Sequence, residues 1–239
     1  ENGKITGIKV NGAEMKADVV VAGADYHHVE QQLLPQTSRQ YSKKYWARRT
    51  MAPSALLFYI GINKKVNNLE HHNLFFDAAF EKHADEIYKD PKWPENPAIY
   101  VSCSSKTDAS VSPEGHENLI VLIPVAPGLD DTEETRNHYF ELIIQRIEKI
   151  TGEAIKDHIV FHEAYAHNDF IKDYNSYRGN AYGLANTLMQ TAFLKPKMKS
   201  SRVSNLYYAG QLTTPGPGVP PSIISGEVAA GEVLKQFKN

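Results

Sequence analysis

The chain has 239 residues, of which 41% are hydrophobic and 23% are charged, so it can bury a sizeable core in one large or two smaller domains. Its 26 basic and 28 acidic residues give a net charge of -2, which disfavours nucleic-acid binding because no overall positive field would attract phosphate. Cys103 is the only cysteine, which excludes internal disulfides and cysteine-based zinc sites and is typical of a reducing compartment. We interpret it as a small buried apolar residue.

The sequence predicts neither a membrane-spanning segment nor a signal peptide. No apolar run approaches the roughly 20 residues that cross a bilayer, and the first residues lack the basic start and apolar core of a signal peptide. Glu1 stands where an initiator methionine is expected, which suggests that the chain is a piece of a longer protein.

The first residues predict a β-meander. Residues 5–10 alternate between apolar and polar types, and Asn11-Gly12 is a strong two-residue hairpin signal. Residues 14–16 form the returning strand, and the apolar run at 19–21 predicts a buried strand.

The segment that follows this strand superficially resembles a dinucleotide-binding turn. Residues 19–25 lack the three spaced glycines and the later acidic residue that such a turn needs, so we reject a complete nucleotide site here. Asp25 is instead well placed to cap a helix over residues 26–34.

Residues 38–49 mix aromatic and basic side chains at helix-compatible spacing. Such a helix fits a membrane surface, where rings lie at the headgroup level and cations face anionic lipid. A solvated, partly packed helix is the alternative interpretation.

The middle of the chain predicts an antiparallel-rich sheet covered by helices. A helix with one buried face begins at Asp131-Thr132 and ends at Gly152. The other elements are strands at 54–61, 74–76, 99–102, 119–125 and 159–166 and a short helix at 80–89.

Near the carboxyl end, residues 206–226 predict a buried strand, a tight loop rich in glycine and proline, and a helix that begins near Pro221. Glycines in the loop let the backbone approach a ligand, and the helix start favours an electron-rich or anionic group. An ordinary strand-to-helix connection with extra turn residues is the alternative.

Ten histidines raise the question of a metal site. The second histidine of the His162, Glu163, His167 series comes one residue too late for the pair that binds zinc on one helical face. We therefore expect no metal site. Hydrolase and kinase motifs are also missing from the sequence.

Arg178 and Tyr182 lie in a glycine-bounded aromatic segment and are candidates to point into a cleft. The alternative is a turn that an arginine holds by binding backbone carbonyls.

Residues 205–226 resemble the C-terminal flavin motif of the carotenoid (phytoene) desaturase family. Gly210, Pro215-Gly216, Gly218-Val219-Pro220 and Ser225-Gly226 fall in register with that motif. The departures are residues 211–214 and Pro221, where the family often has glycine. Further blocks that resemble the family, in the same order, lie at 19–25, 71–76, 97–101, 107–119 and 177–184, so the resemblance covers nearly the whole chain.

The resemblance implies an α/β (α+β) fold: the C-terminal part of an FAD-dependent amine-oxidase-like flavoprotein, with a sheet-and-helix substrate domain inserted between pieces of the FAD domain. Residues 1–35 and 199–239 would belong to the FAD domain and residues 36–198 to the substrate domain. The dinucleotide fingerprint would lie in a missing N-terminal portion, so we expect the chain alone to bind FAD weakly and to be inactive.

The implied activity is FAD-dependent desaturation of a carotenoid precursor such as phytoene, with hydride passing to the flavin and a neighbouring proton leaving. Arg178 and Tyr182, from the glycine-bounded aromatic segment, are the candidate catalytic residues. The implied partners are a long polyene and, for a cytoplasmic protein, the membrane surface that holds it. Alternatives are a retinol saturase or carotenoid isomerase of the same fold, or a non-catalytic lipid- or membrane-binding module. The implied cofactor-binding residues are Gly210, Gln211, Pro215, Gly216, Gly218, Val219, Pro220 and Ile223.

Overall fold

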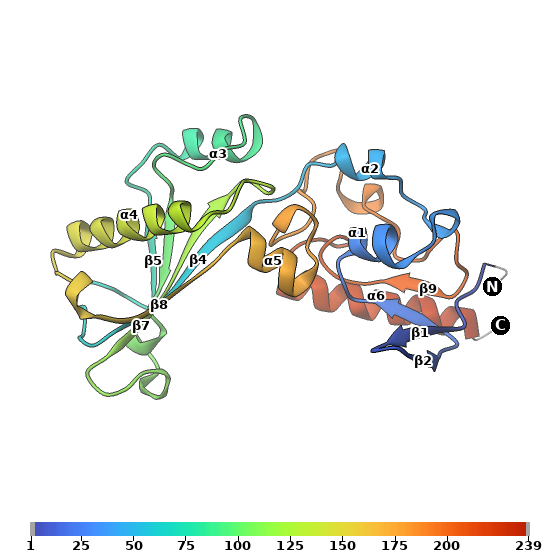
Figure 1. The fold of residues 1–239 in the computed structure, drawn as a ribbon, viewed down its shortest axis with the longest axis horizontal. Coiled ribbons are helices and arrows are strands. Elements are labelled where there is room, and N and C mark those ends of the chain that lie inside the picture. The colour runs from blue at the N-terminus through green and yellow to red at the C-terminus, as the bar shows by residue number, and fades with distance from the viewer. Residues whose placement is uncertain (1–2, 238–239) are drawn as a thin grey trace. The chain divides into compact units, whose positions relative to one another are not determined.

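The computed structural model describes residues 3–237 of the chain (Figure 1). These residues divide into two compact units. The first unit runs up to Ala52 and resumes at Ile171, and the second covers Pro53–Phe170. The first unit is therefore discontinuous in sequence, whereas the second is a single continuous segment.

The second unit is built on one five-stranded sheet in which every pairing is antiparallel, with strand order β5-β6-β7-β4-β8. This confirms the predicted sheet. Its strands are β4 (Ser54–Ile62), β5 (His72–Phe75), β6 (Ile99–Ser102), β7 (Glu117–Val125) and β8 (Ile159–Tyr165).

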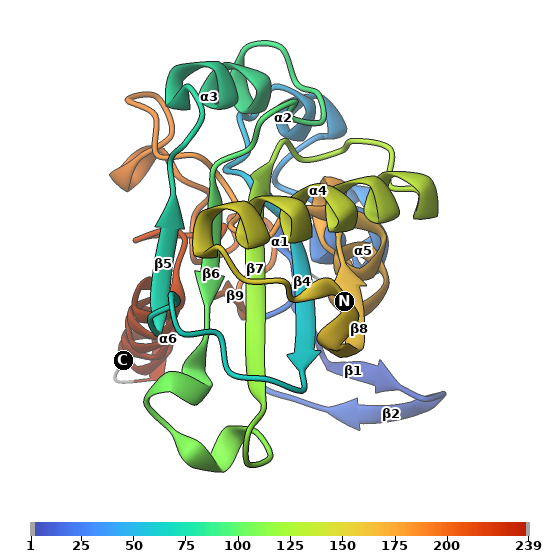
Figure 2. The same ribbon diagram turned by 90° about the vertical axis from the view of Figure 1, so that its left-hand side faces the viewer.

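Helix α4 (Glu133–Thr151) lies across one face of this sheet (Figure 2). Its ends follow the sequence: the Thr132 side chain accepts a hydrogen bond from the Thr135 N–H, and Gly152 ends the helix with a φ of 72°. A shorter helix, α3 (Phe80–Tyr88), precedes β6.

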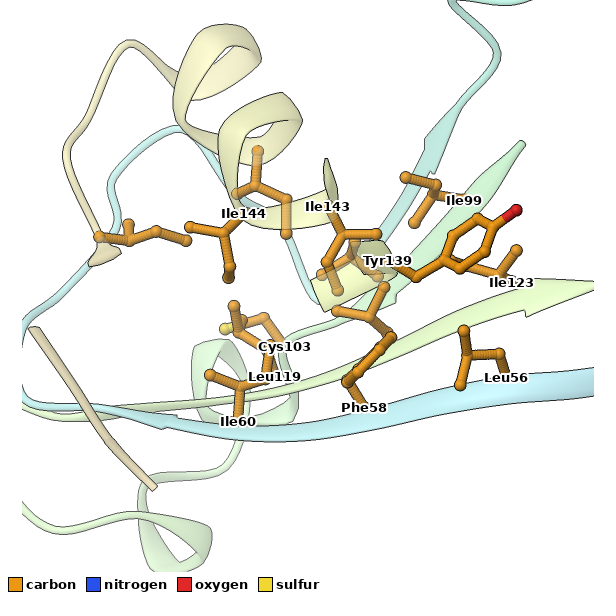
Figure 3. Close-up of a cluster of buried hydrophobic side chains, with 14 of the residues drawn as sticks. Leu56, Phe58, Ile60, Ile99, Cys103, Leu119, Ile123, Tyr139, Ile143 and Ile144 are labelled. Carbon is orange, nitrogen blue, oxygen red and sulfur yellow. The ribbon is translucent and has the colours of Figure 1, made fainter. Parts of the chain in front are cut away.

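The core of the second unit forms between α4 and the sheet (Figure 3). Ile143 and Ile144 of α4 are fully buried against apolar side chains of the strands, whereas Ile150 in the last turn is 44% exposed. Cys103 is also fully buried there, with its thiol 3.4 Å from both the Ser105 hydroxyl and a Glu117 carboxylate oxygen. Burial raises the pKa of this thiol, which confirms its interpretation as a buried structural residue.

The first unit begins with a two-stranded hairpin of β1 (Gly7–Val10) and β2 (Ala13–Lys16). Asn11 and Gly12 both adopt positive φ angles, 50° and 85°, as the predicted turn requires.

A second, parallel pair consists of β3 (Val20–Ala22) and β9 (Leu206–Tyr208). β9 is fully buried, but Val21 of β3 is 49% exposed, so the prediction of a buried strand at this position is wrong. The reason is that β3 pairs with only one neighbour among the described residues.

Helix α1 (Tyr26–His28) follows β3 and continues as a π-helical turn (Val29–Leu33). The Asp25 carboxylate accepts a hydrogen bond from the His28 N–H at 2.9 Å, which confirms the predicted cap. The remaining helices are α2 (Lys43–Ala47), α5 (His167–Tyr174) and α6 (Val219–Phe237), and 3-10 turns lie at Gln36–Ser38, Ser104–Lys106, Ala109–Val111, Lys156–His158, Tyr177–Gly179 and Ala192–Leu194.

The aromatic residues around α2 form the core of the first unit. Trp46 is 1% exposed, and the rings of Tyr26 and Tyr208 stack with their centroids 3.7 Å apart. The fully buried Glu30 accepts hydrogen bonds from the Tyr208 hydroxyl and from the Tyr41 N–H. The expected 12-residue helix over 38–49 is thus a single turn whose rings pack inward, because burying them stabilises the unit more than a longer exposed helix would. Within residues 3–237, no helix is both long and apolar enough to span a bilayer.

Candidate functional site

The connection between β9 and α6 holds most of the predicted ligand-binding residues. Gly210, two residues after the end of β9, has a φ of 110°, and a Cβ atom added there would meet no atom within 4 Å. Its N–H donates to the Ser225 hydroxyl at 2.7 Å, and that hydroxyl donates to the Ser222 carbonyl at 2.6 Å. The backbone therefore turns sharply beside open space while being tied to the first turns of α6.

Three of the residues that depart from the desaturase motif, Leu212, Thr213 and Thr214, anchor this loop. Leu212 packs into the aromatic core, and Thr213 is fully buried with its hydroxyl donating to the Gly210 carbonyl at 2.8 Å. Thr214 donates its hydroxyl to the Ala192 carbonyl at 3.1 Å, and its peptide bond to Pro215 is cis. Leu212, Thr213 and Thr214 thus fix the loop to the core of the first unit and to the turn that contains Ala192.

Gly216 and Gly218 both adopt positive φ angles, 133° and 110°. A Cβ atom on Gly216 would lie 3.1 Å from Cε and 3.2 Å from Nζ of Lys195. Glycine at this position therefore makes room for a lysine of the chain itself, which the sequence did not indicate. At Gly218 the nearest atom, Cδ of Pro221, would be 3.4 Å away, which is ordinary contact.

The start of α6 has fewer free backbone N–H groups than the expected anion site requires. The helix begins at Val219, two residues before the predicted start, and the next two residues are prolines without N–H groups. The Ser222 N–H donates to the Gly218 carbonyl at 3.0 Å. The N-terminus of α6 thus keeps the positive end of the helix dipole but has few free backbone N–H groups. Val219 and Ile223 are 75% and 70% exposed, which leaves an apolar surface beside the loop.

The glycine-bounded turn that carries Arg178 and Tyr182 lies against the same loop. A Cβ atom on Gly183 would approach the Gln211 carbonyl oxygen to 2.9 Å, and the Asn180 side-chain oxygen accepts hydrogen bonds from the Gly183 N–H at 2.8 Å and from the Gln211 amide at 3.4 Å. Arg178 has a φ of 59° and is exposed, and Tyr182 is 37% exposed. Two segments that the sequence singled out separately are thus neighbours.

The end of β3 joins this turn through Asp25. Its carboxylate accepts from the Tyr177 N–H at 3.2 Å as well as from the His28 N–H, and burial raises its pKa. The neighbouring His27 ring lies 3.9 Å from the Tyr177 ring, and burial lowers the pKa of His27 to about 4. This imidazole is therefore neutral at pH 7.

Among residues 3–237, no three His, Cys, Asp or Glu side chains gather as metal ligands.

Lys195 is the residue of this site that sequence reasoning missed. It is 3% exposed, and its Nζ atom has no hydrogen-bond partner among the described residues. Burial lowers its pKa. A lysine in a stretch that also holds Lys197 and Lys199 normally indicates solvent exposure, so no local signal could have marked this one as buried.

The second unit has an apolar pocket of about 350 Å³ between α3 and the sheet. His83 lies at its base: its Nδ1 atom accepts from the Ala98 N–H at 3.0 Å, and Nε2 lies 2.8 Å from the Pro124 carbonyl. Much of the lining is apolar and exposed, namely Leu74, Phe76, Phe80 and Tyr88. The pocket suits an uncharged apolar group.

Comparison with known proteins relates this arrangement to carotenoid enzymes. The chain is 46% identical over 228 residues to the carotenoid 3,4-desaturase of Haloarcula japonica, covering 95% of this chain and 46% of that protein. It is 32% identical over 241 residues to the 4,4'-diapophytoene desaturase (4,4'-diaponeurosporene-forming) of Staphylococcus aureus strain Newman, covering 97% of this chain and 48% of that protein. No protein-family model matches the chain.

Two solved structures share its mixed α/β fold. An oxidoreductase from Methanosarcina mazei aligns with a TM-score of 0.58 and 16% identity, over 97% of this chain and 47% of that one. A protein from Exiguobacterium sp. 255-15 that is titled a putative protoporphyrinogen oxidase aligns with a TM-score of 0.53 and 14% identity, over 95% of this chain and 43% of that one. These likenesses concern the fold alone. Over nearly its whole length the chain is similar to carotenoid desaturases, and it spans about half the length of the curated relatives it matches.

Proposed function

We propose that this chain is the C-terminal portion of an FAD-dependent carotenoid desaturase with an amine-oxidase-like fold. The observation that carries the proposal is the 46% identity over 95% of the chain to a carotenoid 3,4-desaturase. The glycine-proline loop between β9 and α6 supports it independently, because the loop combines positive-φ glycines, open space and an apolar helix start.

The residues at this loop fit a flavin. The open space at Gly210 would receive a flat ring close to the backbone, and the exposed Val219 and Ile223 would cover one of its faces. Gln211, Pro215, Gly216, Gly218 and Pro220 complete the proposed cofactor-binding set. When bound, the flavin supplies the oxidising chemistry by accepting a hydride from the polyene.

We assign the polar contacts nearest the reacting carbons to Arg178 and Tyr182. The turn that carries them packs against the flavin loop at Gln211, so their exposed side chains belong to the same surface as the loop. The guanidinium cannot release its proton at neutral pH, so its proposed role is orientation, whereas the Tyr182 hydroxyl can donate or accept a hydrogen bond.

The missing part of the flavin domain would pair with β3. In a parallel pair, successive residues direct their backbone groups to opposite neighbours. The Val20 N–H bonds to the Asn205 carbonyl and the Ala22 carbonyl accepts from the Ala209 N–H, so the backbone groups of Val21 face away from β9. No strand within residues 3–237 pairs at that edge.

A groove of about 670 Å³ runs beside this open edge. Its lining is mainly apolar and comes from β1 and the residues before it, from β3, from the end of the π-helical turn and the residues after it, and from the segment before β9. It includes Ile5, Ile8, Val21, Leu33, Leu34 and Val203. Parallel sheets are normally covered on both faces, and two strands alone are marginal. Since the chain spans about half the length of its relatives, we propose that a strand of the remaining half fills this edge.

Replacing Val21 by proline tests this pairing. Proline removes the N–H that faces the open edge. In the longer protein we therefore expect the free energy of unfolding to fall by about 3 kcal/mol and less flavin to be retained. In the 239-residue chain alone the loss should be smaller, because no ladder bond is broken. Denaturant unfolding of both forms measures the difference, and Val21→Thr, which keeps the amide, is the control. Equal losses in the two forms would contradict the pairing.

We propose that the second unit binds the polyene and contacts the membrane that holds it. The apolar pocket beside α3 and its exposed rim, Phe76, Phe80 and Tyr88, offer an uncharged surface of the kind that a long hydrocarbon or a lipid bilayer covers. We propose peripheral membrane contact through this rim, in place of residues 38–49, whose rings are packed inside the first unit.

The function is tested with the longer protein that contains this chain. It should purify with a flavin absorption spectrum and, incubated in liposomes with phytoene or with a coloured acyclic carotenoid, shift the polyene spectrum to longer wavelength as conjugated double bonds are added. A shift to shorter wavelength would indicate a saturase, and a change in isomer profile without a change in mass would indicate an isomerase. A flavin-free preparation that still desaturates would refute the proposal.

A further inference from the structure

We propose that Lys195 is the positive charge that stabilises reduced, negatively charged flavin at the β9–α6 loop. The inference rests on the proposed function, and it assigns a role to a residue outside the expected cofactor-binding set. Lys195 is a positioning residue in this role, because its charge acts on the flavin and so raises the midpoint potential of the cofactor.

The first observation is that the ammonium group is buried without a partner. Lys195 is 3% exposed, and Nζ makes no hydrogen bond to the described residues. It also takes part in none of the ion pairs found among residues 3–237. Burying an unpaired charge is costly, so such groups are normally paired or lose their charge. A ligand with negative charge is the partner that would complete this site.

The second observation is where the ammonium lies. The Lys195 Nζ atom and the Asn186 side-chain oxygen would lie 3.2 Å and 3.3 Å from a Cβ atom on Gly216, so both line the glycine-proline loop. The turn before Lys195 is fastened to that loop, because the Thr214 hydroxyl donates to the Ala192 carbonyl. The lysine is thus held against the loop by the backbone of the preceding turn.

The third observation is the shortage of amide donors at the start of α6. A helix N-terminus stabilises negative charge through its dipole and its unpaired N–H groups. Here Pro220 and Pro221 have no N–H, and the Ser222 N–H is already bonded to the Gly218 carbonyl. A lysine beside the loop supplies the positive charge that these missing amides would have provided.

The lowered pKa of Lys195 fits this role. Without a ligand anion, desolvation favours the neutral amine. Negative charge that develops on the flavin during reduction would favour the ammonium form, so the lysine would take up a proton as the cofactor is reduced.

The experiment measures the midpoint potential of the flavin in the longer, flavin-loaded protein. In Lys195→Met we expect at least a tenfold loss of affinity for reduced relative to oxidised flavin, which for a two-electron couple lowers the potential by about 30 mV. Lys195→Arg keeps the charge and should restore most of the potential. The matched control is Lys197→Met, because this lysine is two residues away and exposed. A Lys195→Met potential equal to that of Lys197→Met would overturn the inference.

A measurement on the wild-type protein covers the case in which the variants fail to fold. With lysines labelled at the ε-carbon, NMR should show that the pKa of Lys195 rises when the flavin is reduced. An unchanged pKa for Lys195 would overturn the inference. If the wild-type protein contains no flavin at all, it is the proposed function that fails.

Discussion

Gly183→Ala is expected to destabilise the first unit by about 2–4 kcal/mol and to reduce flavin retention in the longer protein. Gly183 has a φ of 81°, which costs an L-residue about 1–2 kcal/mol. The new Cβ would also lie 2.9 Å from the Gln211 carbonyl oxygen and 3.2 Å from its carbon, and neither backbone atom can move without shifting the loop. The substitution therefore acts on the contact that joins the turn carrying Arg178 and Tyr182 to the loop between β9 and α6.

Gly12→Ala is the matched control. Its φ of 85° is nearly the same, but no atom lies within 4 Å of its added Cβ. It should therefore cost only the conformational strain, about 1–2 kcal/mol, and leave flavin retention unchanged. Equal effects of the two alanines on stability and flavin would show that the contact between Gly183 and Gln211 contributes nothing.

Ile143→Ala is expected to cost the second unit about 2–5 kcal/mol, because it removes three carbons from a fully buried position between α4 and the sheet. Ile150→Ala on the same helix removes the same atoms from a side chain that is 44% exposed, and it should change stability by less than about 1 kcal/mol. Similar losses for both substitutions would contradict the packing seen in Figure 3.

The two tryptophans of the chain allow each unit to be followed separately. Trp46 lies in the first unit and Trp93 in the second, so single Trp→Phe backgrounds give one fluorescence signal per unit. Denaturant unfolding should then show Gly183→Ala in the Trp46 signal and Ile143→Ala in the Trp93 signal. A two-unit chain need not unfold in one step, and separate probes keep the two free energies distinct.

Features set by nearby residues could be predicted from the sequence. The hairpin at Asn11-Gly12, the Asp25 cap, and the Thr132 and Gly152 ends of α4 each depend on interactions within a few residues. The order of strands in the second unit needed the structure, but its antiparallel pairing followed from the short apolar segments and their turns.

Features set by distant residues could not be predicted. Helix propensity and amphipathic spacing suggested a long helix over 38–49, yet burial of Trp46 against Tyr26 limited it to one turn. In the candidate site, the glycine-proline loop was recognisable because its motif is continuous. Lys195 was not, since its burial depends on Gly216, which is far along the chain. The roles proposed for Arg178 and Tyr182 remain predictions.

The discontinuity of the first unit has a consequence for how the protein is made. The Asn205 side chain donates to the Asp18 carbonyl across 187 residues of sequence, beside the pairing of β3 with β9. During synthesis, β3 leaves the ribosome long before its partner exists, whereas the second unit is complete once Phe170 has emerged. Closing so large a loop is entropically unfavourable, so we expect the second unit to fold first and to shorten the span that the two halves must close. Until then, the edge of β3 that pairs with β9 stays open to chaperones and to aggregation.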